Sequence, residues 1–145
     1  MALTAEQRAQ LYYKWFYQEG YNPKEPEADE DKDFSIILKK EGLSIVVYFH
    51  ANDPAFVRFI LPNFFSLETE DEKINMYLAA EHVGRRCKLA KIQGNTAEDP
   101  DDCWALVEFL HGNDELNPDL AERYIGMLLG GANEFRSKMS QLKVG

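Results

Sequence analysis

A two-residue turn, Glu41-Gly42, separates the run Phe34-Ser-Ile-Ile-Leu-Lys-Lys40 from the run Leu43-Ser-Ile-Val-Val-Tyr-Phe-His50. Both runs are rich in β-branched and aromatic residues, which favour strands. A turn of this length, with a glycine available for positive φ, is typical of a β-hairpin. A third run, Phe56-Val-Arg-Phe-Ile-Leu61, is closed by Pro62, which cannot donate to a ladder. The sequence therefore predicts an antiparallel meander of three strands.

A helix is expected before this meander. Thr4 and Gln7 have the spacing of a capping box, so the helix begins after Thr4, and it runs to about Gln18, with Gly20 as its stop. Residues 21–33 contain two prolines and an excess of carboxylates, which predicts a solvated acidic connector with no core of its own.

The second half of the chain is expected to contain two further helices and two further strands. A second capping box at residues 69–72 begins a helix that is expected to end at Val83-Gly84, with the glycine as its C-cap. Two strands are expected at about 87–93 and 102–110, and Asn117-Pro118 begins a last helix that runs to about Ser140. The predicted class is α+β, an antiparallel sheet of about five strands with packed helices in the order αβββαββα.

Composition is typical of one globular domain, residues 1–145. Hydrophobic residues make up 45% and charged residues 28% of the 145 positions. The formal charge of −9 argues against binding of nucleic acid or of anionic membranes. No apolar run reaches the length of a membrane span, and the N-terminal residues lack the pattern of a secretory signal, so a cytoplasmic location is expected.

Motifs that would indicate catalysis are absent from the sequence. The three histidines, His50, His82 and His111, lack the spacing of metal ligands, and His50 beside Asn52 and Asp53 is best interpreted as a polar loop tip. Cys87 and Cys103 are expected to be reduced. Residues 21–33 lack the glycine of a calcium-binding loop. We expect no catalytic residue, no metal and no cofactor.

Two smaller features have both a structural and a functional interpretation. The basic residues Arg85, Arg86, Lys88 and Lys91 can form an anion site, or they can compensate a helix end and alternate along a strand, which we favour. Gly130-Gly131 lies within a helical pattern, where close helix packing is favoured over contact with a phosphate.

The second helix carries two apolar stripes at helical spacing. Ile74, Tyr77 and Leu78 form one, and Met76, Ala80 and Val83 form the other. A helix that is apolar on two sides needs two neighbours, of which one is the sheet and the other a second subunit. We expect a homodimer, with Met76, Ala80 and Val83 as candidate interface residues.

The first helix is unusually aromatic. Tyr12, Trp15 and Phe16 share a side with Leu11, whereas Tyr13 and Tyr17 fall largely outside that arc. The helix either lies in a groove with its tyrosine hydroxyls in water, or it presents an aromatic surface to a partner segment. Tyr13, Tyr17 and Trp15 are the candidate partner-binding residues. The acidic connector would steer a basic segment toward them, through Glu25, Glu27, Asp29, Glu30 and Asp31.

The element order and several core stretches resemble the YbjN family of small bacterial proteins, whose fold is like that of the type III secretion chaperones. The matching stretches are Gly42-Leu-Ser-Ile-Val-Val-Tyr-Phe49, Phe56-Val-Arg-Phe-Ile-Leu-Pro62, Tyr77-Leu-Ala-Ala-Glu-His82, Lys88-Leu-Ala-Lys-Ile92 and Trp104-Ala-Leu-Val-Glu-Phe109. The resemblance implies helices packed on an antiparallel sheet, no known catalytic residues, and a regulatory or chaperone-like role with a polypeptide partner. The expected function is therefore a non-enzymatic protein-binding module. The alternative is a small-molecule sensor or an uncharacterised enzyme that uses a pocket between helices and sheet.

Overall fold

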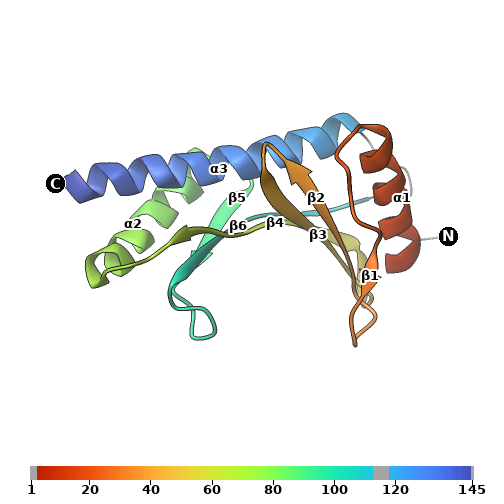
Figure 1. The fold of residues 1–145 in the computed structure, drawn as a ribbon, viewed down its shortest axis with the longest axis horizontal. Helices are drawn as coiled ribbons and strands as arrows, with labels where there is room; N and C mark the ends of the chain where they lie inside the picture. The colour runs from red at the N-terminus through yellow and green to blue at the C-terminus, as the bar shows by residue number, and fades with distance from the viewer. Residues whose placement is uncertain (1–2, 113–117, 145) are drawn as a thin grey trace. The chain divides into compact units, whose positions relative to one another are not determined.

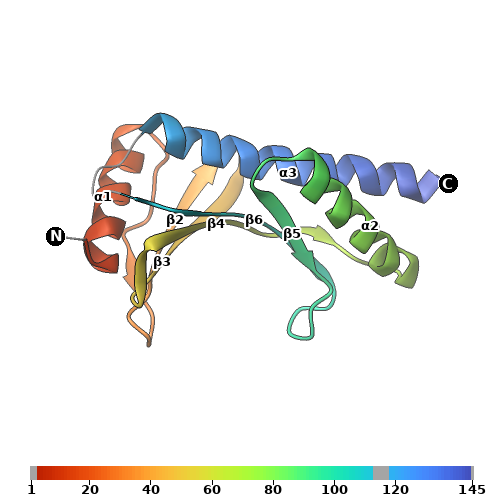
Figure 2. The ribbon, with the colours of Figure 1, turned by 180° about the vertical axis from the view of Figure 1, so that it is seen from behind.

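The computed structural model describes residues 3–112 and 118–144, which form three helices and six strands (Figures 1 and 2). The elements are α1 (Ala5–Gln18), β1 (Glu27–Ala28), β2 (Phe34–Lys40), β3 (Leu43–His50), β4 (Asp53–Ser66), α2 (Glu70–Arg86), β5 (Ala90–Gly94), β6 (Asp102–Leu110) and α3 (Pro118–Val144). The strands form one antiparallel sheet in the order β1-β2-β3-β4-β6-β5. The predicted α+β class and order are confirmed, with the short strand β1 in addition.

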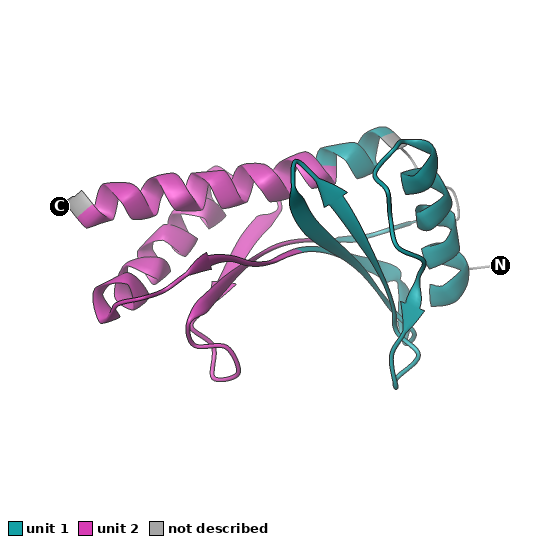
Figure 3. Cartoon of the chain, in the orientation of Figure 1, with its two compact units in different colours: residues 1–60, 108–123 teal, residues 61–107, 124–145 magenta. Residues whose placement is uncertain are grey.

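The chain divides into two compact units that interleave along the sequence (Figure 3). Unit 1 comprises residues 1–60 and 108–123, and unit 2 comprises residues 61–107 and 124–145. Strands β4 and β6 and helix α3 each contribute residues to both units, so neither unit corresponds to a continuous part of the sequence.

The core of unit 1 is the predicted hairpin. Strands β2 and β3 pair from Lys40–Leu43 to Phe34–Phe49, and the turn between them places both Glu41 and Gly42 at positive φ, as a type I′ turn requires. Alternate residues of both strands are buried, which is the period of a sheet with one face in the core: Ile36, Leu38, Ile45, Val47 and Phe49. Helix α1 contacts these strands (Figure 1). Its Tyr12 ring lies 5.1 Å from the ring of Phe49.

Helix α1 has the ends that the sequence predicted. The Thr4 hydroxyl accepts a hydrogen bond from the Gln7 amide, and the Gln7 side chain accepts one from the Thr4 amide, which completes the capping box. The helix ends at Gln18, and Gly20 adopts φ +82°. This is a conformation that glycine adopts without strain.

Unit 2 is built around α2, β5 and the larger part of α3. Helix α2 contacts β5 (Figure 2). Its buried residues are Met76, Ala79 and Val83. In α3, the ring of Phe135 packs edge-on against Phe64 and Phe65 at centroid distances of 5.5 and 5.3 Å.

Several predicted boundaries in the middle of the chain are wrong. Strand β4 continues through Pro62 to Ser66. The pairing with β3 ends at Val46–Ile60, so the missing N–H of Pro62 interrupts no bond of that ladder. Helix α2 passes through Gly84 and ends at Arg86, because an exposed glycine lowers helix propensity without terminating a helix.

The predicted start of β5 and the predicted end of α3 are also wrong. Strand β5 starts at Ala90, because residues 84–86 are helical and Leu89 adopts φ +68°. Helix α3 begins at Pro118, as predicted, and continues past Ser140 to Val144. Asn117 lies outside the described residues.

The second capping box is incomplete. The Thr69 hydroxyl accepts from the Glu72 amide, but the Glu72 carboxylate accepts from the amide of Glu68 rather than from that of Thr69. The expected cap residue is therefore correct, and the reciprocal bond lies one residue earlier in the chain.

Candidate functional site

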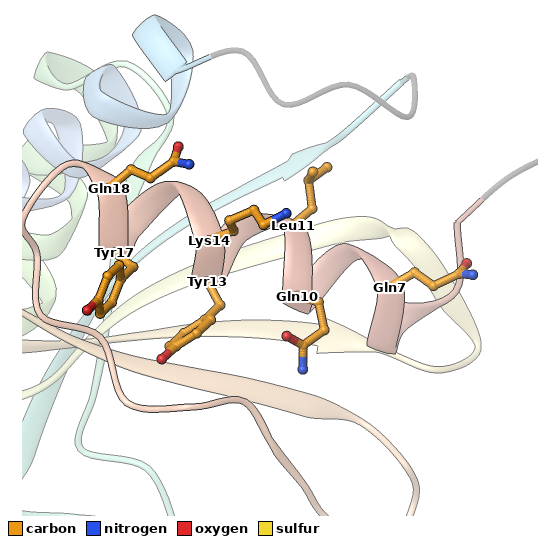
Figure 4. A pocket seen from close by; sticks show the side chains of 7 residues that line it. All are labelled: Gln7, Gln10, Leu11, Tyr13, Lys14, Tyr17 and Gln18. Atoms are coloured by element: carbon orange, nitrogen blue, oxygen red, sulfur yellow. The ribbon is translucent and has the colours of Figure 1, made fainter.

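The solvent-facing side of α1 carries two of the three residues predicted to bind a partner. Tyr17 is 68% exposed and Tyr13 is half-buried, and their ring centroids lie 6.3 Å apart. Tyr13 and Tyr17 project to the same side of the helix (Figure 4). The i, i+4 spacing of the two tyrosines therefore produces one continuous aromatic surface.

These rings belong to a shallow groove of about 830 Å³. Its lining residues all lie on α1: Gln7, Gln10, Leu11, Tyr13, Lys14, Tyr17 and Gln18 (Figure 4). Amide side chains and tyrosine hydroxyls can donate and accept hydrogen bonds, and the rings and Leu11 offer apolar contact. The groove is chemically suited to a polypeptide, whose backbone needs both kinds of contact. We call it the α1 groove.

Trp15 does not belong to this surface. It is only 8% exposed, and its indole packs 4.9 Å from the Phe16 ring and 5.7 Å from the Tyr21 ring. Its assignment to a partner-binding surface is therefore wrong, because Trp15 lies on the side of α1 that covers the core.

The connector between α1 and β2 is more ordered than its composition suggested. Tyr21 and Pro23 are buried, and residues 27–28 pair with β2 as strand β1. The predicted absence of a core is therefore wrong for the first residues of the connector. The steering carboxylates are all exposed, as expected: Glu25, Glu27, Asp29, Glu30 and Asp31.

Three of the connector's carboxylates are close enough to hold a cation. One oxygen each of Asp29, Asp31 and Asp33 lies within 4.8 Å of the others. The Asp29 carboxylate also accepts from the amides of Asp31 and Asp33, and the Tyr48 hydroxyl lies 2.8 Å from its Oδ2. The hydrogen bond from Tyr48, followed by those from the two amides, holds the pKa of Asp29 below its usual value. These bonds account for the geometry of the cluster without a metal.

The histidines of the described residues each have a partner. His50 Nδ1 lies 3.8 Å from Asp33, His82 Nε2 lies 2.8 Å from a Glu134 oxygen, and His111 Nδ1 lies 2.7 Å from the Tyr12 hydroxyl. His50 ends β3 before a turn, and the connector folds back so that Asp33 lies against it.

The two cysteines are unpaired and poorly suited to nucleophilic chemistry. Cys103 is fully buried opposite Gly94, and desolvation raises its thiol pKa to about 12. Desolvation, with the nearby Glu134 carboxylate, also raises the pKa of Cys87. Both thiols are protonated at neutral pH, whereas the thiolate is the reactive form.

The predicted dimer interface on α2 is not a surface. Met76 is 3% and Val83 0% exposed within a single chain, and Ala80 is half-buried. The assignment of this stripe to a second subunit is therefore wrong, because the residues around it in unit 2 already cover Met76 and Val83. The opposite stripe lies in solvent, where Ile74, Tyr77 and Leu78 are each more than half exposed.

A second concave surface lies within unit 2, between the start of α2 and the end of α3. It has a volume of about 780 Å³. Phe65, Ile74, Met139 and Leu142 supply its apolar lining, and its charged residues are Glu68, Asp71, Glu72 and Lys143. Sequence patterns could not locate this cleft, because its two walls come from residues more than sixty positions apart in the chain.

The basic residues Arg85, Arg86, Lys88 and Lys91 lie in the last turn of α2 and in the residues that follow it. Arg85 forms an ion pair with Glu81 at 2.9 Å, one helical turn earlier, and Arg86, Lys88 and Lys91 are exposed. Arg85 and Arg86 lie in the last turn of α2, where they compensate the negative helix end.

Comparisons with known proteins show the fold of the chain and no family. No protein-family model matches it, and no curated protein is similar to it. No described helix combines the length and apolar character that crossing a membrane requires. The structure is similar to the crystal structure of an uncharacterized protein from Methanothermobacter thermautotrophicus, with a TM-score of 0.68 and 12% sequence identity over 92% of this chain and 97% of that chain. At this identity the likeness shows a shared α+β fold, which an archaeal protein also adopts.

Proposed function

We propose that this chain is a non-enzymatic regulatory or chaperone-like module that binds a polypeptide segment in the α1 groove. The observation that carries the proposal is the pair of adjacent rings of Tyr13 and Tyr17, with Tyr17 68% exposed on a helix whose other side is packed in the core. Tyrosine supplies a large contact area at interfaces while its hydroxyl remains compatible with water in the free protein.

The charge of the surroundings favours a basic segment. The acidic connector follows α1 directly in the chain and belongs to the same unit, and its carboxylates apart from Asp33 are exposed. Such a field raises the rate of encounter with a cationic chain and is screened by salt. The resemblance of the core stretches to the YbjN family and to the secretion chaperones supports the same class of function. On the same charge argument, we propose that the protein does not bind nucleic acid.

The proposal is tested by selecting peptides from a random library with the full chain and measuring their affinities. The double variant Tyr13→Ser with Tyr17→Ser should weaken binding at least tenfold and leave the melting temperature nearly unchanged. A matched control is Leu89→Ser, which removes an exposed apolar side chain outside α1 and should leave peptide binding intact. If the α1 variant instead lowers the melting temperature by several degrees, or binds the peptides as tightly as the wild type, the α1 groove is not the binding surface.

The cleft in unit 2 supports a second candidate, a small-molecule sensor. A mixed apolar and polar lining and a volume of about 780 Å³ are within the range of ligand sites. A thermal-shift screen against metabolites separates the two candidates. Hits that are lost in Ser140→Trp, which places a large ring at an exposed lining residue of the cleft, favour the sensor, whereas a screen without hits leaves the peptide-binding module.

A further inference from the structure

Helix α2 presents a continuous solvent-facing stripe whose charges have opposite sign at its two ends. The stripe consists of Glu70, Ile74, Tyr77, Leu78, Glu81 and Arg85, all exposed; apart from the neighbours Tyr77 and Leu78, successive members are three or four positions apart. It lies opposite the buried residues Met76, Ala79 and Val83. Three large apolar side chains in the middle, flanked by a carboxylate at one end and a guanidinium at the other, form an unpartnered helix face.

The order of these residues is self-complementary. Glu70 lies seven residues before Tyr77, and Arg85 lies seven residues after Leu78. A two-fold axis between Tyr77 and Leu78 would therefore place Glu70 of one copy beside Arg85 of the other, about 11 Å along the helix on each side of the axis.

We propose that two copies of this chain associate through antiparallel α2 helices, with Tyr77 and Leu78 at the two-fold axis and two intermolecular Glu70–Arg85 pairs at the ends. In this arrangement Ile74 faces the methylene groups of Glu81, whose carboxylate is held by Arg85 of its own chain at 2.9 Å. Antiparallel helices also bring each positive N-terminal end next to a negative C-terminal end.

At the centre of the stripe, the side chain of Tyr77 is held in one orientation by a hydrogen bond within the chain. The Tyr77 hydroxyl accepts a hydrogen bond of 3.0 Å from the side-chain amide of Asn95, which holds the exposed ring in one orientation. A side chain that is already ordered loses less entropy on association. Each copy carries a net charge of −9, and this long-range repulsion is screened over about 8 Å at physiological ionic strength.

A second copy is the occupant that the charge order favours. A foreign helix would have to reproduce both the apolar centre and the reversed charges, whereas a second α2 carries both by symmetry. The proposal does not depend on the α1 groove, which lies in unit 1, whereas α2 lies in unit 2.

Charge reversal tests both the interface and its antiparallel register. Sedimentation velocity of the full chain at tens of micromolar should give a dimer for the wild type and a monomer for Glu70→Lys alone and for Arg85→Glu alone. An equimolar mixture of these two variants should restore the dimer, because each copy then meets opposite charges at both ends. The double variant Glu70→Lys/Arg85→Glu should also dimerise, since both pairs are reversed together.

The rescue cannot arise from effects within one helix. Glu70→Lys removes an ion pair with Lys73, and Arg85→Glu removes one with Glu81, and mixing restores neither. Arg86→Glu is the matched control, because Arg86 lies outside the stripe and should leave the dimer intact. Circular dichroism confirms that each variant is folded.

Three results would overturn the proposal: a monomeric wild type, a dimer that survives both single reversals, or a mixture that stays monomeric. Tyr13→Ser with Tyr17→Ser should remain dimeric whether or not the α1 groove binds peptides, so the two proposals fail separately.

Discussion

The hydroxyl of Tyr12 lies 2.7 Å from Nδ1 of His111, so a residue of α1 is hydrogen-bonded to a residue 99 positions later in the chain. Tyr12 is 1% exposed, and its ring also packs against Phe49 and Phe59. A phenol with this degree of burial needs a partner for its hydroxyl, and His111 supplies one immediately after β6. The contact joins the two sequence segments of unit 1.

We expect Tyr12→Phe to destabilise the protein by about 1 kcal/mol, because the ring remains packed while the hydrogen bond is lost. For a domain of this size that corresponds to a decrease in melting temperature of about 2–6 °C. Thermal unfolding followed by circular dichroism measures it. Tyr17→Phe is the control, since that side chain is largely exposed, and an equal decrease in both variants would contradict the role assigned to the hydrogen bond.

Gly130 and Gly131 are neighbours in α3 with different surroundings. A Cβ at Gly131 would lie 2.7 Å from the Cβ of Ala90, whereas a Cβ at Gly130 would have no atom within 4 Å. We expect Gly131→Ala to destabilise by about 1–3 kcal/mol through overpacking. Gly130→Ala should stabilise by about 0.5–1 kcal/mol through helix propensity.

Chemical denaturation of the two glycine variants measures the expected destabilisation and the expected stabilisation in one experiment. Ala90→Gly combined with Gly131→Ala should recover part of the loss, because it removes the methyl group that the new Cβ meets. Equal effects of the two single variants would mean that Gly131 is not a close contact between α3 and β5.

The lowered pKa of the Asp29 carboxylate predicts how the stability of the protein changes at acidic pH. Its pKa is lowered in the fold, chiefly by the Tyr48 hydroxyl, so the charged form is favoured in the native state. This contribution is fully present above the unfolded value of about 3.9 and is lost as the pH falls through the lower native value. Asp29→Asn should therefore show a smaller loss of stability below pH 4 than the wild type.

Tyr48→Phe should reduce the same acid dependence, because it removes the donor that holds the carboxylate in its charged form. Glu30→Gln serves as the control, since it removes a neighbouring exposed carboxylate. Urea denaturation between pH 2.5 and 6 compares the four proteins. An unchanged pH profile in Asp29→Asn would show that the Tyr48 contact contributes nothing to stability.

The fold could be predicted from the sequence wherever a turn or a helix end has a strong local sequence pattern. The hairpin at 34–50 and the ends of α1 are correct to the residue, because a two-residue turn, a capping box and a helix-ending glycine each act within a few positions. Boundaries that depended on one residue were wrong at Pro62 and Gly84. Pro62 lies beyond the last residue of β4 that pairs with β3, and an exposed glycine such as Gly84 lowers helix propensity without ending a helix.

The candidate surfaces were predicted less well. Tyr13 and Tyr17 do lie on the solvent side of α1, but Trp15 does not, because helical periodicity separates faces without showing which face meets the core. On α2 the two apolar stripes were correctly recognised, but the stripe that was predicted to face a second subunit is the one that is buried within the chain. Met76 and Val83 contact the interior because the chain of unit 2 folds over them, and nothing within residues 70–86 encodes that choice.

The sequence by itself determined the α+β class, the order of the elements, the hairpin and the caps, because these follow from spacing and from the conformational preferences of neighbouring residues. Only the tertiary structure decided which helix faces are buried, that His111 meets Tyr12, that Gly131 rather than Gly130 meets β5, and that Ile74, Tyr77 and Leu78 remain in solvent. Those outcomes depend on contacts between segments far apart in the chain. The physical reason is that burial is a property of the packed molecule, whereas amphipathic spacing is a property of a single helix.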